Sequence, residues 1–125
     1  MSIAIRAIWI LIFSLALIPD ARADNSPLVI TPGLQFDYAQ KLLHEKDYAT
    51  AMVEFKRFVH FFPYHRKINS ANLQIARCQY NLTQYHESAK TLNEIILKDQ
   101  DKEITRQAVF LQSDAFLKLG NQGYA

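Results

Sequence analysis

The sequence predicts an all-α protein made of stacked antiparallel helix pairs, about two and a half of them, behind a short export segment. Three observations lead to this fold class. Apolar residues recur with helical spacing from Leu34 onward, the helical segments resemble one another in pairs, and no stretch of useful length alternates apolar and polar residues. A chain of 125 residues with a 50% apolar composition is long enough for one domain with a hydrophobic core.

Residues 1–23 have the pattern of a secretory signal peptide. A single charge at Arg6 precedes an apolar run over residues 7–18, and Ala21-Arg22-Ala23 provides a small-x-small cleavage site. The run covers roughly 18 Å as a helix, less than the ~30 Å hydrocarbon core of a membrane. A span counted from the first residue leaves an uncleaved anchor as the alternative. We expect cleavage before Asp24 and a periplasmic or secreted protein that touches the membrane only if this segment is retained.

A leader and five helices are expected after the cleavage site. Residues 24–33 contain two prolines and a glycine, which predicts an extended leader. The helical repeats then occupy residues 34–125, in segments 34–63, 68–98 and 104–125, the last of them incomplete. The clearest amphipathic stripe consists of Tyr48, Ala51, Met52, Phe55, Phe58, Val59 and Phe62. Later stripes consist of Tyr85, Ala89, Leu92, Ile95 and Ile96, and of Ile104, Ala108, Leu111, Ala115 and Leu119.

An internal repeat connects these segments. Tyr48, Tyr85 and Tyr124 stand 37 and 39 residues apart, and each has an alanine nine residues earlier, at Ala39, Ala76 and Ala115. Only small side chains let two helix axes approach to about 8–10 Å, so these alanines are expected where the first helix of each pair crosses the second.

The segment 46–63 carries the most specific pattern. An Asp-Tyr turn at Asp47 is followed by small Ala51, aromatic Phe55 and Phe58, and terminal Pro63. This pattern resembles the second helix of the tetratricopeptide repeat family. A second copy matches at Tyr85, Ser88, Leu92 and Ile95 but has Gln100 in place of the proline, and a third keeps Ala115, Gly123 and Tyr124.

The resemblance implies a non-enzymatic scaffold that binds a protein or peptide, similar to the exported repeat proteins of the Gram-negative envelope. In such a fold the first helices line a concave face. The family's groove-facing positions correspond to Phe36, Gln40, His44, Leu73, Arg77, Tyr80, Gln112 and Phe116. Arg77 is the expected polar anchor, in a ladder with Gln40 and Phe116. Ordinary packing between helices is the alternative for Phe36, Leu73 and Phe116.

Other classes of function find no support in the residues. The chain has no Gly-rich phosphate loop, nucleophile elbow, paired-histidine metal motif or Cys-x-x-Cys, so we expect no catalytic residue, metal or cofactor. A net charge of +2 does not favour nucleic acid. His60 and His65 are expected at the surface, and the sole thiol, Cys78, is either buried and inert or reactive. The alternative function is an arm of a larger envelope enzyme whose catalytic region lies beyond residue 125.

The third pair is expected to be unfinished. Its first helix, 104–119, is followed by a turn at 120–123, but only Tyr124 and Ala125 remain for the second. We therefore expect a longer natural chain, because a helix pair of a solenoid is stable only when its apolar side is covered. Self-association through this unfinished repeat is a further possible partner interaction.

Overall fold

The structure, a computed structural model, describes residues 27–98 and 101–122, and this part of the chain is helical without a strand. Its elements are α2 (Pro32–His44), α3 (Tyr48–Phe61), α4 (Ile68–Asn81), α5 (Tyr85–Lys98) and α6 (Lys102–Gln122). The predicted all-α class is therefore confirmed. The predicted signal peptide, its cleavage site and the start of the leader lie outside the described residues, as do Gln100, Gly123 and Tyr124.

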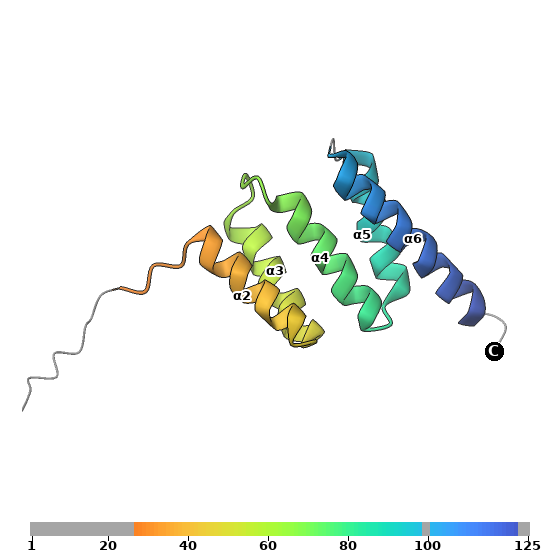
Figure 1. Ribbon diagram of the computed structural model, residues 1–125, viewed down its shortest axis with the longest axis horizontal. Helices are drawn as coiled ribbons and strands as arrows, with labels where there is room; N and C mark the ends of the chain where they lie inside the picture. Colours follow the sequence, from red (N-terminus) through yellow and green to blue (C-terminus); the bar gives the residue numbers. More distant parts are fainter. Residues whose placement is uncertain (1–26, 99–100, 123–125) are drawn as a thin grey trace, which may run out of the picture.

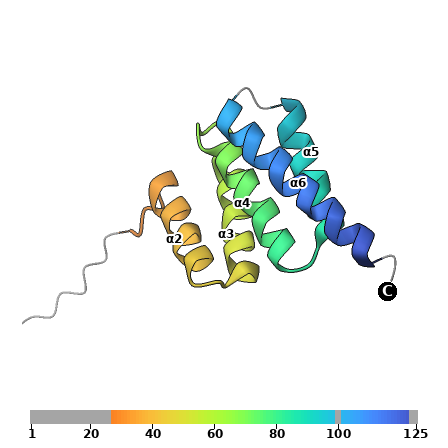
Figure 2. The same ribbon diagram turned by 45° about the vertical axis from the view of Figure 1, so that its right-hand side comes forward.

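The helices pack in the order in which they follow one another along the chain. α2 packs on α3, α3 on α4, α4 on α5 and α5 on α6, and α6 also touches α4. Figure 1 shows α2, α4 and α6 in one layer with α3 and α5 behind them, and Figure 2 shows the same succession after a turn of the view. The described chain therefore enters at one end of the row of helices and leaves at the other.

The first core cluster joins α2, α3 and α4 around three aromatic rings. Phe36 meets Phe55 and Phe58 edge-on, with ring centroids 5.5 and 5.3 Å apart. Side-chain caps fix the starts of the helices that carry these rings: the Thr31 hydroxyl accepts from the backbone N–H of Leu34, and the Asp47 carboxylate accepts from that of Thr50. The complete cluster of buried residues is Phe36, Ala39, Leu42, Ala51, Phe55, Phe58, Ala71, Ile75 and Cys78.

The second core cluster joins α4, α5 and α6 and consists of Leu73, Ala76, Leu92, Ile95 and Ala108. Ala76 is fully buried, and the Ser88 hydroxyl of α5 donates to its carbonyl oxygen at 2.8 Å. Ala39 is likewise fully buried in the first pair. Both alanines therefore lie at tightly packed positions, as the sequence predicted.

Two identical turns give the helix pairs their repeat. Lys46 and Thr83, 37 residues apart, both have a φ of 61°. In each turn this residue donates its N–H to the carbonyl three residues earlier, and the next residue donates to the carbonyl five residues earlier. These are the two bonds of a Schellman motif, in which glycine usually takes the left-handed position. Sequence inspection missed both motifs because neither residue is glycine.

The change Thr83→Gly should raise the free energy of unfolding by about 0.5–1 kcal/mol. A β-branched residue in the left-handed region destabilises the folded protein by roughly 1–2 kcal/mol, and glycine removes this strain. Part of the stabilisation is offset because glycine also gives the unfolded chain more conformational freedom. Urea unfolding followed by circular dichroism measures the change. Lys90→Gly on the exposed face of α5 is the control and should destabilise by about 1 kcal/mol, as glycine does within helices. A destabilised Thr83→Gly protein would contradict the strain assigned to this turn.

The last helix, α6, follows the same interval of 37 residues, which corrects the sequence alignment. Ala71 and Cys78 are fully buried where α4 packs on the preceding pair. Ala108 and Ala115, 37 residues later, are fully buried on α6, which packs on α5. Alignment of Ala115 with Ala76 was therefore wrong by two residues. The residue of α6 that corresponds to Ala76 is Ser113, which follows Ala76 by 37 residues.

The predicted end of the last helix also needs correction. α6 runs to Gln122, through Gly120 and Asn121, where a turn was expected. Glycine adopts helical backbone angles as readily as turn angles, so its presence alone does not end a helix.

Candidate functional site

A hollow of about 410 Å³ lies between α4 and α6 and is the best candidate for a binding site. Its lining combines two guanidinium groups, one amide and two apolar side chains, from Arg77, Arg106, Gln107, Phe110 and Leu111. Arg77 is partly buried, and its Nη2 donates to the Gln107 amide oxygen on α6 at 2.6 Å. Its Nη1 donates to the Gln74 amide oxygen on its own helix at 3.4 Å. Two neutral oxygens therefore hold the Arg77 side chain in the lining of the hollow.

The charge of Arg77 is not neutralised within the described ranges 27–98 and 101–122. No carboxylate there lies within ion-pair distance of its guanidinium. Arg106, at the rim, differs because it pairs with Glu103 one turn away. Hydrogen bonds from Gln107 and from Arg106 lower the pKa of Glu103, so this carboxylate stays ionised. The hollow thus presents an apolar wall beside one uncompensated positive charge.

Tyr80 fixes the separation of the two helices that form the hollow. One turn after Arg77, its hydroxyl donates to the Asp114 carboxylate on α6. That hydrogen bond, together with burial, raises the pKa of Tyr80 to about 12. Its ring also meets the Tyr85 ring edge-on at 5.2 Å, which ties α4 to the start of α5. Tyr80 therefore acts as a brace within the protein, with its hydroxyl already engaged.

The remaining predicted groove residues do not share one surface. Phe36 and Leu73 belong to the two core clusters, so inter-helix packing describes them. Gln112 donates its amide to the Ala89 carbonyl of α5 at 3.2 Å. Phe116 is 56% exposed and is not among the residues that line the hollow.

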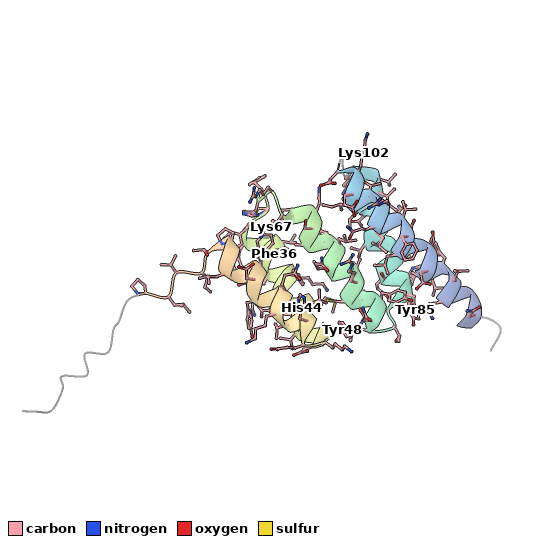
Figure 3. The ribbon with its side chains drawn as sticks, in the orientation of Figure 1. Phe36, His44, Tyr48, Lys67, Tyr85 and Lys102 are labelled. Atoms are coloured by element: carbon pink, nitrogen blue, oxygen red, sulfur yellow. The ribbon has the colours of Figure 1, made fainter. Side chains whose placement is uncertain are left out.

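The other two predicted residues on α2, Gln40 and His44, lie at the other end of the row of helices. His44 Nδ1 is 2.9 Å from the carbonyl oxygen of Gln40, one turn earlier in the same helix. Figure 3 shows His44 and Tyr48 on either side of the first turn, well away from α6. Of the expected ladder Gln40–Arg77–Phe116, only Arg77 therefore lines the hollow.

Sequence inspection missed the residues that α6 contributes to the hollow, although the interval of 37 residues indicates one of them. Counting from Leu73 gives Phe110. Counting from Arg77 gives Asp114, which lies outside the hollow and bonds with Tyr80. Gln107 carries no signal in the sequence, because its importance comes from the position of α4 beside α6.

A second surface, over α2 and α3, has a different electrostatic character. Two hollows of about 350 and 340 Å³ adjoin Gln35 and Arg57 there. The buried carboxylate of Glu54 lines the larger of the two, and it accepts from the Gln35 amide at 2.6 Å and from the Arg57 guanidinium at 2.7 Å. The Glu54 carboxylate is thus neutralised by the Arg57 guanidinium and hydrogen-bonded by the Gln35 amide. The network therefore braces α2 against α3 and offers no unpaired charge to a ligand.

The other reactive side chains have structural roles. Cys78 is fully buried, and burial raises the pKa of its thiol to about 11, so very little thiolate is present near neutral pH. His65 meets the Phe58 ring edge-on at 5.3 Å, and its Nδ1 accepts from the Lys67 backbone N–H at 3.2 Å. The Lys67 ammonium in turn lies 4.4 Å from the centroid of the Phe36 ring. Both residues are labelled in Figure 3.

Within residues 27–98 and 101–122, no group of three or more His, Cys, Asp and Glu residues is placed to hold a metal ion. None of the helices in this part of the chain combines the length and apolar character that a membrane span requires. Comparison of the chain with protein-family models, with curated proteins and with solved structures found no match.

Proposed function

We propose that this protein is a non-enzymatic scaffold of the tetratricopeptide repeat type, exported by its N-terminal segment, that binds a protein or peptide in the hollow between α4 and α6. The observation that carries the proposal is the partly buried guanidinium of Arg77, held by amide oxygens and left without a carboxylate partner among the described residues. Helix pairs with identical turns 37 residues apart support the repeat type. The signal-peptide pattern of residues 1–23 supports export.

A carboxylate of the ligand is the group that this site fits best. The planar guanidinium of arginine binds a carboxylate through paired hydrogen bonds, and partial burial strengthens them. Because Gln74 and Gln107 already orient the Arg77 side chain, little rotamer freedom is lost on binding. The neighbouring Phe110 and Leu111 supply an apolar wall for the side chain next to that carboxylate. A short acidic peptide segment with an adjacent apolar residue has this chemistry.

Replacement of Arg77 by alanine should weaken peptide binding by about 10- to 150-fold, the equivalent of about 1.5–3 kcal/mol for charged hydrogen bonds. Fluorescence anisotropy with labelled peptides that contain Glu next to Leu or Phe measures the affinity. The same peptides with Gln in place of Glu should bind the unaltered protein as weakly as the original peptides bind Arg77→Ala.

Arg66→Ala is the matched control, because Arg66 is an exposed arginine outside the hollow. This variant should retain the affinity of the unaltered protein. Circular dichroism shows whether each variant is folded. A folded Arg77→Ala protein that binds every acidic peptide with unchanged affinity would overturn the assignment of the hollow.

A further inference from the structure

The outer side of α6 carries a second apolar stripe, distinct from the one that packs on α5. Four side chains form this outer stripe, and they are 45, 77, 56 and 66% exposed: Val109, Phe110, Phe116 and Leu117. With a turn of about 100° per residue, they surround Ser113 on the side of the helix opposite Ala108 and Ala115. Singly exposed apolar residues are common, but a stripe of four on one helix face marks an interaction surface.

The interval of 37 residues identifies what the outer stripe is built to contact. Phe110, Ser113 and Phe116 follow Leu73, Ala76 and Gln79 of α4 by 37 residues. Those three residues are buried on α4, where the Ser88 hydroxyl and the Thr91 hydroxyl of α5 donate to Ala76 and Gln79. In α2 the same face consists of buried Phe36, Ala39 and Leu42. The outer stripe is therefore the face by which the first helix of each pair holds an antiparallel partner helix.

The outer stripe is also complementary to itself. Its residues are arranged symmetrically about Ser113, since Phe110 and Phe116 each stand three positions away and Val109 and Leu117 each stand four. A second α6, inverted about a twofold axis at Ser113, would place Phe110 against the Phe116 of the second copy and Val109 against its Leu117. The small side chain at the centre permits close approach of the two axes, as Ala39 and Ala76 do within the chain.

The charges at the edge of the stripe permit this pairing. In the inverted arrangement Arg106 stands opposite Gly120 of the second copy, so no like charge faces it. A Cβ added at Gly120 would meet no atom within 4 Å, which leaves room for the long Arg106 side chain.

We propose that the outer stripe of α6 is occupied by the α6 helix of a second copy of this chain, antiparallel to the first, in a twofold homodimer. The exposed parts of the two phenylalanine rings amount to about 270 Å², taking ~200 Å² for a whole ring. A standard interface buries roughly 800 Å² on each partner. The helix contact alone is smaller than that, so the dimer exchanges with monomer and its population rises with protein concentration.

Disulfide trapping in the full chain tests both the partner and the register. In Ser113→Cys the two new thiols lie on the twofold axis, so mild oxidation should yield a covalent dimer. The only native thiol, Cys78, is buried and does not compete. Leu97→Cys is the matched control, since Leu97 is 75% exposed on α5, outside the stripe, and it should form dimer at least tenfold more slowly.

A mixture of two variants tests the direction of the helices. Val109→Cys mixed with Leu117→Cys should yield the mixed disulfide in preference to either self-disulfide. In the antiparallel arrangement, Val109 of one copy is displaced by eight residues, about 12 Å along the helix axis, from Val109 of the other copy. The same holds for Leu117, and this distance is too long for a disulfide. Preferred self-disulfides would indicate parallel helices and overturn the proposed arrangement.

Sedimentation equilibrium provides a measurement that does not depend on cysteine chemistry. The unaltered chain should dimerise with rising concentration, and Phe116→Asp should raise the dissociation constant at least tenfold, whereas Leu97→Asp should leave it unchanged. Circular dichroism verifies that both variants are folded. A chain that stays monomeric at every concentration, with Ser113→Cys no faster to cross-link than the control, would overturn the proposal. That result would mean that a different helix, from this chain or another protein, covers the stripe.

Discussion

Replacement of Phe58 by alanine should lower the free energy of unfolding by about 3–5 kcal/mol, as removal of a buried aromatic ring typically does. Phe58 is fully buried, and its ring contacts Phe36, Phe62 and His65 at centroid distances of 5.3, 5.6 and 5.3 Å. The partners come from α2, from the end of α3 and from the loop before α4. Loss of the ring would leave a cavity at the point where three parts of the first core cluster meet.

Phe61→Ala is the matched control for this prediction. Phe61 lies three residues later on the same helix but is 63% exposed. Its removal should change stability by less than about 0.5 kcal/mol, as for most surface positions. Urea unfolding followed by helical circular dichroism measures both variants. Equal destabilisation by the two changes would show that the rings of α3 are arranged differently from this structure.

The second large effect is expected from Ala76→Glu, which should cost more than about 4 kcal/mol and unfold the α4–α5 pair. Overpacking at a tight helix crossing costs about 1–3 kcal/mol, and an unpaired carboxylate buried there costs several more. Ala76 has no exposed surface, and the Ser88 hydroxyl is bonded to its carbonyl, so α5 cannot move aside without losing that bond.

Ala49→Glu makes the same chemical change at an exposed position in the first turn of α3. A negative charge near a helix N-terminus is favourable, so this control should be neutral or slightly stabilising. Thermal unfolding compares the two proteins. A folded and equally stable Ala76→Glu protein would contradict the assignment of Ala76 to the crossing of α4 and α5.

The fold could be predicted from the sequence where local pattern decides the structure. Ala51, Phe55 and Phe58 repeat with helical spacing, and all three are fully buried in α3. The starts of α2 and α3 also leave a local signal, because the Thr31 and Asp47 caps lie within a few residues of the N–H groups that they bind. The register of α6 leaves no such signal, because Ala115 and Ser113 are both small. Only the packing of α6 on α5 shows that Ala115 is the residue of α6 that faces the preceding helix pair.

The candidate site could be predicted only in part, for the same reason. The helical phase of Arg77 relative to Ala76 predicts a position beside a groove, because that relation lies within one helix, and in the structure Arg77 lines the hollow between α4 and α6. The identity of its neighbours depends on how α6 crosses α4, and no pattern within a single helix contains that information. Phe36 and Leu73 were predicted to face the groove, but they belong to the core clusters. The sequence cannot distinguish the two locations, because a large apolar side chain suits a groove and a core equally well.

The succession of neighbour-to-neighbour contacts has a consequence for how the chain folds. All substantial packing in the described part joins helices that are adjacent in the chain, apart from α4 with α6, which are next but one. Contacts that are short-range in sequence require little loop closure, which favours rapid folding. Folding can begin in the α2–α3 pair or in the α4–α5 pair. Because α4 contributes residues to both core clusters, its packing couples the formation of one cluster to that of the other. Loss of structure accordingly spreads inward from α2 or α6, and the central helix is the last to become exposed.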